Sequence, residues 1–234
     1  MGDSGYVTDL SRHELARRMA ELARSVAIPR AVSDVLSDVT AEAKKLISGV
    51  DAAGVLLIGK ANKFDSVAGT SELPHRLDEL QMEYREGPCM QAALGDLIVR
   101  TDDFRTERRW PKYAPATVAL GVLSALSFKL YTSSQTAGAL NLFAFQADAF
   151  DAEAETIGAV LAAHAAAAIL AGRHSEQLES ALSTRDRIGQ AKGIIMERYN
   201  LDDVAAFDML RRLSQDSNVR LVTIAERVIE TRGS

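Results

Sequence analysis

The sequence has 234 residues, of which 47% are hydrophobic and 25% are charged, and its 27 basic and 32 acidic residues give a net charge of −5. This is the composition of a soluble globular chain, long enough for one large or two modest domains. A single cysteine excludes an intrachain disulfide and a cysteine-based zinc cluster, and the negative charge means that a polyanion would need a local basic patch.

Two helices are predicted before any strand. Ser11 and Glu14 form a capping-box pattern, and the apolar residues after them recur at near-helical spacing as far as Pro29. A second stripe of apolar residues at helical spacing starts near Ser33, which is a residue type suited to a helix cap, and runs to Gly49.

Two hairpins are predicted in the middle of the chain. Residues 52–58 are apolar and β-branched enough for a buried strand, and a turn at 59–62 leads to a more polar strand at 63–69. Two further strand-like runs, 122–131 and 137–145, flank a polar turn. Between the hairpins the pattern predicts a helix at 71–84, a short helix after Cys89, a strand at 96–100, an irregular charged loop at 101–111 and a helix at 113–120. The prediction is an α+β fold in which helices pack on an antiparallel sheet.

A long helix is predicted to follow the second hairpin. An alanine-rich helical pattern runs from Asp151 to Tyr199, which exceeds the length of a usual globular helix and indicates a coiled-coil or signalling helix between two domains. Ala181, Ile188 and Ile195 fall seven residues apart, so this helix can contribute to a homodimer with help from domain contacts.

No membrane segment or export signal is expected. The most apolar stretch, residues 157–171, is mostly alanine and is interrupted by His164, so we expect no membrane-spanning run. The first residues include Asp3, Asp9 and Glu14 and lack an apolar signal core. We therefore expect a cytoplasmic protein.

Three short helical patterns occupy the last fifty residues. The second begins at Asp202 and Asp203, whose carboxylates suit a helix N-terminus. Each helix is too short to persist alone in water, so the three must bury their apolar stripes against one another or against a partner. The stripes are Ile188, Ala191, Ile194, Ile195 and Met196; then Val204, Phe207, Leu210 and Leu213; then Leu221, Ile224, Ala225 and Val228.

This region resembles a known family in the run from Gln190 to Met196 (QAKGIIM), in Ala206-Phe207, in Leu210-Arg211-Arg212, in Ser214, Asn218 and Leu221, and in Ile224-Ala225. These residues are similar to the ANTAR domain, a three-helix RNA-binding module of bacterial transcription antiterminators. The resemblance implies a dimer that binds paired small-loop hairpins of a nascent transcript and disfavours the terminator. Where the family often has a Ser that caps helix three, this chain has Val222, and Thr223 would take that role if the helix began one residue later.

A second resemblance covers residues 30–172. It rests on Glu86-Gly87-Pro88-Cys89, Trp110-Pro111, Gly121 through Ser127, Gly138-Ala139-Leu140-Asn141-Leu142 and Phe150. These residues look like a GAF domain of the type that precedes ANTAR in actinobacterial regulators. Many sensors share this fold, so the resemblance implies an architecture more than a ligand.

The basic residues near the C-terminus allow two interpretations. Residues 173–234 contain ten basic and ten acidic residues, so ordinary solvated helix faces would explain them, and RNA binding requires that the basic ones converge on one surface. Tyr199 fits either a base-stacking platform or, as we favour for an aromatic at a helix end, a core position. The RNA-facing residues are predicted to be Gln190, Lys192, Arg198, Arg211, Arg212, Asn218 and Arg220. The bundle core is predicted to be Ala191, Ile195, Phe207, Leu210, Leu221 and Ala225.

Few residues suggest chemistry. Cys89, at a predicted helix N-terminus, is a candidate ligand contact, although a buried and inert thiol is favoured. The four histidines are scattered without a metal-binding spacing, and no paired acid and base or activated nucleophile is visible. We therefore expect no metal, no cofactor and no enzymatic activity.

The predicted organisation is a tail and helix at 1–29, a GAF-like sensor at 30–172, a connecting helix at 173–183 and an ANTAR-like RNA-binding domain at 184–230. The predicted function is transcription antitermination by an RNA-binding homodimer under control of the sensor, which can bind a small molecule. The alternative is a small-molecule-sensing module whose C-terminal bundle binds protein or DNA.

Overall fold

The computed structural model describes Arg17 and residues 30–58, 64–132 and 135–231. The helix predicted between Ser11 and Pro29 and the turn predicted at 59–62 lie outside the described residues. The chain divides into two compact units, Met1–Gly172 and Arg173–Ser234, each with its own hydrophobic core.

The first unit is built on an antiparallel sheet, as predicted. Its described strands are β1 (Ala52–Ile58), β2 (Phe64–Val67), β3 (Ile98–Thr101), β4 (Ser124–Thr132) and β5 (Gln135–Ala144). They lie in the order β2-β1-β5-β4-β3, and every neighbouring pair is antiparallel. Both predicted hairpins are present, since β1 pairs with β2 and β4 pairs with β5.

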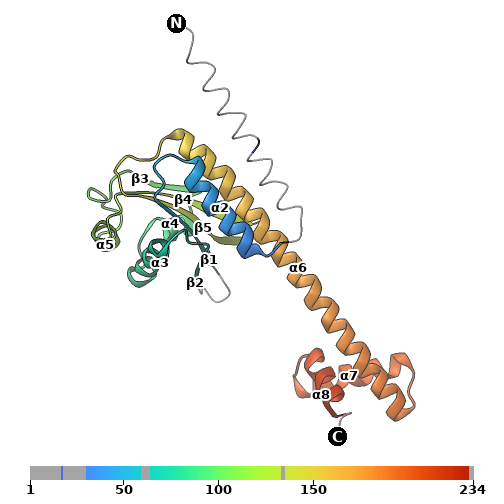
Figure 1. The fold of residues 1–234 in the computed structure, drawn as a ribbon. Helices are drawn as coiled ribbons and strands as arrows, with labels where there is room; N and C mark the ends of the chain where they lie inside the picture. Colours follow the sequence, from blue (N-terminus) through green and yellow to red (C-terminus); the bar gives the residue numbers. More distant parts are fainter. Residues whose placement is uncertain (1–16, 18–29, 59–63, 133–134, 232–234) are drawn as a thin grey trace. The chain divides into compact units, whose positions relative to one another are not determined.

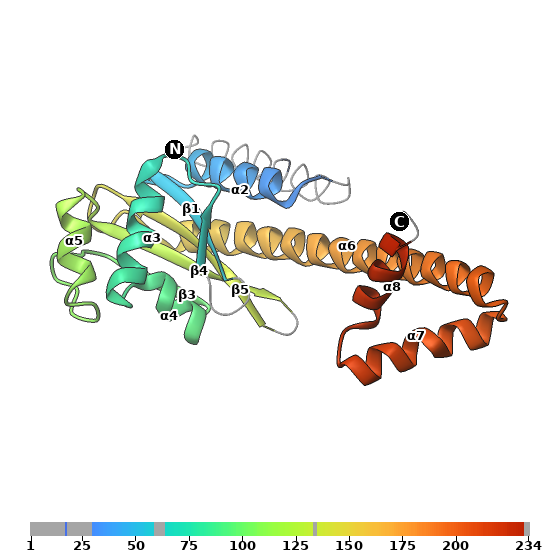
Figure 2. The same ribbon diagram turned by 90° about the horizontal axis from the view of Figure 1, so that it is seen from below.

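Helices cover both faces of this sheet (Figures 1 and 2). One face carries α2 (Val32–Leu46) and the first part of α6 (Ala152–Tyr199), and the other carries α3 (Glu72–Tyr84), α4 (Pro88–Leu94) and α5 (Tyr113–Ala119). Successive residues of a strand point to opposite faces, so the three central strands β1, β5 and β4 contribute to the cores on both faces.

The core under α2 and α6 is aliphatic and tightly packed. Alternate strand residues such as Val55, Leu126 and Leu140 meet Leu161 of α6 there. Gly158 permits this approach, because a Cβ at that position would lie 2.2 Å from the ring of Phe128. The helix therefore packs directly onto an aromatic ring of the sheet.

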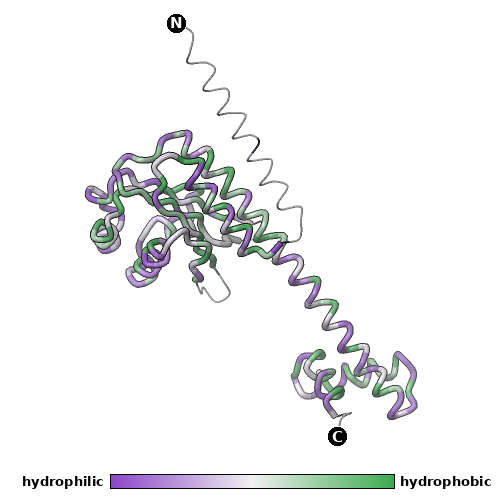
Figure 3. Tube along the Cα trace, viewed as in Figure 1, coloured by the Kyte–Doolittle hydropathy of each residue, from purple (hydrophilic) through white to green (hydrophobic). Residues whose placement is uncertain are grey.

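Composition alone would allow α6 to cross a membrane, contrary to our expectation from the sequence. It is long enough and reaches a mean hydropathy of 1.6, but half of that apolar window is buried inside the protein. Ile157, Leu161, Ala165 and Ile169 pack in the core of the first unit. In Figure 3 the hydrophobic residues of α6 concentrate where it covers the sheet. The apolar composition is thus largely that of a core helix.

The second unit contains the end of α6 with α7 (Asp203–Ser217) and α8 (Leu221–Glu230). Asp202 caps α7 by accepting a hydrogen bond from the Ala205 amide at 2.8 Å, as predicted. The expected shift in the start of α8 was wrong: the helix begins at Leu221 after Arg220, without a side-chain cap. The buried core consists of Ala191, Ile195, Ala206, Leu210, Ile224 and Ala225.

Two aromatic residues of this unit were placed wrongly. Phe207 was predicted in the core, but 39% of it is exposed, and Tyr199, for which core packing was favoured, is 54% exposed. The buried residues of α7 are Ala206 and Leu210 instead. Adjacent residues of a helix point about 100° apart, so a helix that buries Ala206 leaves Phe207 off the buried face.

Candidate functional site

A buried polar cluster joins α3 and α4 to the sheet in the first unit. The carboxyl of Asp78 accepts hydrogen bonds from Ser66 Oγ at 2.7 Å, Gln81 Nε2 at 3.3 Å and Asn141 Nδ2 at 3.4 Å. Ser127 Oγ extends the chain by donating to Asn141 Oδ1 at 2.7 Å. One carboxyl therefore connects β2, α3, β5 and, through Asn141, β4.

The environment of this carboxyl favours its neutral form. Within the described residues no Lys or Arg forms an ion pair with Asp78, which is 1% exposed. Burial raises the pKa of Asp78 to about 7, against the opposing effects of the Ser66 hydrogen bond and the charge of His75. Sequence reasoning marked Ser127 and Asn141 only as part of a family resemblance and did not single out Ser66, Asp78 or Gln81, because the members come from separate elements without a recognisable spacing.

Cys89 lies beside this cluster and is inaccessible. It is 1% exposed and packs against Leu56 and Ala139, and its backbone amide donates to Gln81 Oε1 at 2.9 Å. Burial raises the pKa of the thiol well above its ordinary value, and the charge of Asp78 raises it further. The geometry supports the inert interpretation and gives Cys89 no open path to a ligand.

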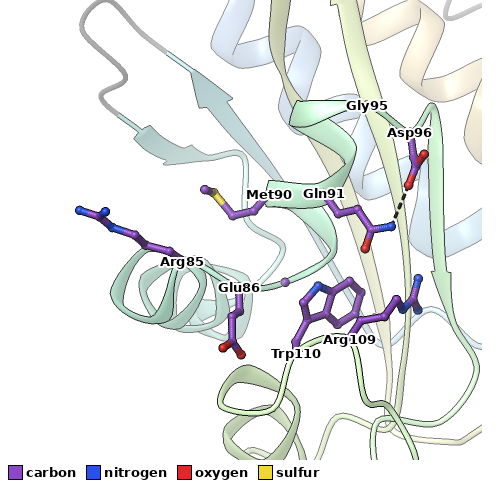
Figure 4. A pocket seen from close by; sticks show the side chains of 9 residues that line it. Arg85, Glu86, Met90, Gln91, Gly95, Asp96, Arg109 and Trp110 are labelled. Carbon is purple, nitrogen blue, oxygen red and sulfur yellow. Dashed lines mark hydrogen bonds between the residues drawn. The ribbon is translucent and has the colours of Figure 1, made fainter.

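A surface pocket of about 420 Å³ opens next to α4 (Figure 4). Its wall comes from the loop between α3 and α4, from α4 itself, from the turn after α4 and from the loop that follows β3. The lining residues are Arg85, Glu86, Gly87, Met90, Gln91, Gly95, Asp96, Arg109 and Trp110.

The polar groups of this pocket are held in place by the fold. The guanidinium of Arg109 lies over the indole of Trp110, with Cζ 4.4 Å from the ring centroid, and donates to the carbonyl of Arg100 at 2.7 Å. Gln91 Nε2 donates to Asp96 Oδ2 at 2.7 Å. Glu86 accepts from the backbone amide of Lys112 at 2.8 Å. The pocket is therefore a preformed candidate site for a small molecule.

Sequence reasoning found only part of this pocket. Glu86, Gly87 and Trp110 appeared as markers of a family resemblance, whereas Gln91, Asp96 and Arg109 were not singled out. Gly87 has φ of 128°, and a Cβ there would lie 2.5 Å from the side-chain oxygen of Gln81, so this position needs glycine.

Three of the predicted RNA-facing residues lie on α6. Gln190 and Arg198 are exposed. Lys192 is more enclosed, with its side chain 26% exposed, and its ammonium pairs with the carboxylate of Asp203 at the start of α7. Lys192 therefore also joins two helices of the bundle.

The other four lie between residues 211 and 220. Arg211 Nη2 pairs with Asp208 Oδ1 at 3.1 Å, whereas Arg212 and Arg220 are exposed and form no ion pair within the described part of the chain. Asn218 has φ of 53° and ends α7 in the left-handed conformation. Of the five basic residues predicted to face RNA, Lys192 and Arg211 thus pair with acids. Arg198, Arg212 and Arg220 form no ion pair within the described residues and can contact a phosphate. RNA contact by these residues stays a prediction.

Comparisons with known families match both units. Residues 29–170, more than half of the chain, match the GAF domain family, and residues 176–229 match the ANTAR domain family. No curated protein matches the chain in sequence.

Solved structures share the fold at low sequence identity. The Stigmatella aurantiaca phytochrome photosensory core module is 12% identical with a TM-score of 0.57 and covers 86% of this chain and 45% of that one. The GAF domain of an Acinetobacter phosphoenolpyruvate-protein phosphotransferase is 15% identical with a TM-score of 0.52, covering 67% and 92%. Free methionine-R-sulfoxide reductase from Neisseria meningitidis is 15% identical with a TM-score of 0.50, covering 67% and 89%.

At these identities the structures establish the fold alone. The family matches establish the order of the domains. The chain therefore belongs to the GAF domain family, and its GAF domain is followed by an ANTAR domain.

Proposed function

We propose that this chain is a cytoplasmic transcription antitermination regulator of the actinobacterial type, and not an enzyme. Its ANTAR domain binds hairpin loops of a nascent RNA, and its GAF domain controls that binding. The observation that carries the proposal is the pair of family matches in this order, since both families are regulatory. The exposed Arg198, Arg212 and Arg220, which form no ion pair within the part of the chain that the structure describes, supply positive charge for phosphate contacts.

The continuous helix α6 offers a route for control. Leu161 and Ile169 of α6 belong to the core of the GAF unit, while Ala191 and Ile195 of the same helix belong to the core of the ANTAR unit. A rearrangement of the GAF core therefore acts on a helix that also forms part of the RNA-binding bundle. A small molecule in the pocket at Trp110 is the proposed input.

The exposed leucines of α6 support a homodimer. Leu178 and Leu182 are 54% and 61% exposed and lie on one side of the helix at i and i+4. Covering them with the same segment of a second copy would bring two ANTAR domains together. Two weak hairpin contacts would then reinforce each other through their effective concentration.

The test is a binding titration of the full chain. The ligand is the tightest RNA recovered by selection from a pool of hairpins with randomised loops, and duplex DNA of equal charge is the competitor. Replacing both Arg212 and Arg220 with Gln should weaken RNA binding at least about tenfold and lower the salt dependence of the affinity by about one ion per lost phosphate contact.

Arg76→Gln is the matched control, because Arg76 is an exposed arginine on α3 of the GAF unit. It should bind RNA as the wild type does. Equal affinity for RNA and duplex DNA, or binding that is indifferent to both ANTAR arginines, would count against the proposal and favour a bundle that binds DNA or protein.

A further inference from the structure

The ANTAR unit exposes both of its aromatic side chains. Tyr199 and Phe207 are the only aromatic residues between positions 173 and 234, and they are 54% and 39% exposed. The buried core of the unit is entirely aliphatic. A phenylalanine gains free energy by burial, so the 39% of Phe207 that stays exposed is apolar surface available to a partner.

The neighbours of Phe207 on α7 are apolar on one side and cationic on the other. Val204, three residues earlier, is 69% exposed, and Arg211, four residues later, is also exposed, so the three side chains adjoin on the helix surface. Asp208 Oδ1 lies 3.1 Å from Nη2 of the Arg211 guanidinium and fixes its position. A flat ring between an aliphatic side chain and a guanidinium group is suited to a planar ligand.

The charges of the side chains differ between the start of α7 and its second half. Its first turn is acidic, with Asp202 as the cap followed by Asp203. Beyond Phe207 the two arginines Arg211 and Arg212 balance the two acids Asp208 and Asp216. A polyanion is therefore repelled less from the second half of the helix than from its acidic start, with Phe207 at the boundary.

We propose that Phe207, flanked by Val204 and Arg211, is a stacking platform for an unpaired RNA base whose phosphates lie toward Arg211 and Arg212. Bases in hairpin loops can be splayed out and stacked on aromatic rings, whereas those of a duplex are already stacked. This inference rests on the proposed function, because it assigns the residue that holds the loop base.

The experiment uses the full chain and the selected RNA hairpin, with 2-aminopurine placed at each loop position in turn. Phe207→Leu keeps the apolar bulk but removes the flat ring, and Phe207→Trp keeps a flat ring. We expect Phe207→Leu to weaken binding about 5- to 100-fold and to abolish the quenching of one loop position, while Phe207→Trp retains both. The salt dependence should not change, because no charge is lost.

Tyr199→Leu is the matched control, since Tyr199 is the other exposed aromatic residue but ends α6 three residues before Asp202, the acidic cap of α7. It should bind within about twofold of the wild type. Wild-type affinity and unchanged quenching for Phe207→Leu would overturn this inference while leaving RNA binding intact. Failure of the wild-type chain to prefer any hairpin over duplex DNA would overturn the proposed function itself. A Phe207→Leu variant that loses self-association but keeps RNA affinity would also overturn the inference, in favour of a protein contact.

Discussion

The GAF and ANTAR units place their aromatic and charged side chains in different ways. The GAF unit buries Phe104, Phe128 and Phe143 and encloses the carboxyl of Asp78 among hydrogen-bond donors. The ANTAR unit buries aliphatic side chains and leaves both aromatic residues on its surface. The first arrangement places aromatic rings and a carboxyl in the interior, and the second leaves aromatic rings on the surface, where a partner can reach them.

The largest expected effect compares one substitution in both units. Phe143→Ala removes a fully buried ring and should cost about 3–5 kcal/mol of unfolding free energy. Phe207→Ala removes a ring at the surface and should cost about 1 kcal/mol or less. Urea denaturation followed by circular dichroism, with hydrogen exchange to resolve the two units, measures both. Similar costs at the two sites would break the comparison.

The next effect is a dependence of GAF stability on pH. The pKa of Asp78 is about 7 in the folded chain, above its ordinary value of 3.8. Well below pH 4 the carboxyl is therefore neutral in both the folded and the unfolded chain, and its raised pKa does not lower the free energy of unfolding. As the pH rises toward 7 the unfolded chain ionises first, and the folded state loses on the order of 3–4 kcal/mol, which then stays constant at higher pH.

Asp78→Asn should remove this dependence, because the amide cannot ionise. The measurement is the difference in unfolding free energy between wild type and variant from pH 4 to 8, in which the contributions of other groups cancel. The wild type should lose stability relative to the variant as the pH rises. A difference that does not vary with pH would mean that Asp78 is not neutral in the folded chain.

The smallest expected effect is the difference in stability between two glycine-to-alanine variants of α6, at Gly158 and at Gly193. Gly158→Ala places a methyl group against the ring of Phe128 and should cost about 1–3 kcal/mol. Gly193→Ala, where nothing lies within 4 Å, should gain up to about 1 kcal/mol from helix propensity. Thermal unfolding of the two variants distinguishes them, and a stabilising Gly158→Ala would show that α6 does not pack closely on the sheet.

Periodicity predicted the elements well but not which side of α7 is buried. The α8 residues Leu221, Ile224 and Ala225 are spaced i, i+3, i+4 and stay on one face, where all three are at least partly buried. Val204 and Leu213 of α7 belong to a run spaced by three residues throughout, which turns about 60° around the helix at each step. Such a run spans half the circumference, so only part of it can face the core, and Leu210 is its buried member.

The two candidate sites could not be predicted from the sequence, for another reason. Ser66, Asp78 and Asn141 are far apart in sequence and meet only when the sheet and α3 assemble. The same holds for the pocket, where Gln91 of α4 and Arg109 of a distant loop share a wall. Neither set has a characteristic spacing, so a single sequence carries no local signal for them. The family resemblance supplied the domains but not these contacts.

The stacking of Arg109 on Trp110 gives the chain a built-in optical reporter. Trp110 is the only tryptophan in the sequence, and it lines the pocket of the GAF unit. Under excitation that tyrosine does not absorb, the emission of the unlabelled protein therefore comes from this one residue, and the ANTAR unit contributes no signal. A spectral change on adding RNA would have to travel from one unit to the other, so an ordinary fluorimeter can record communication between them in real time.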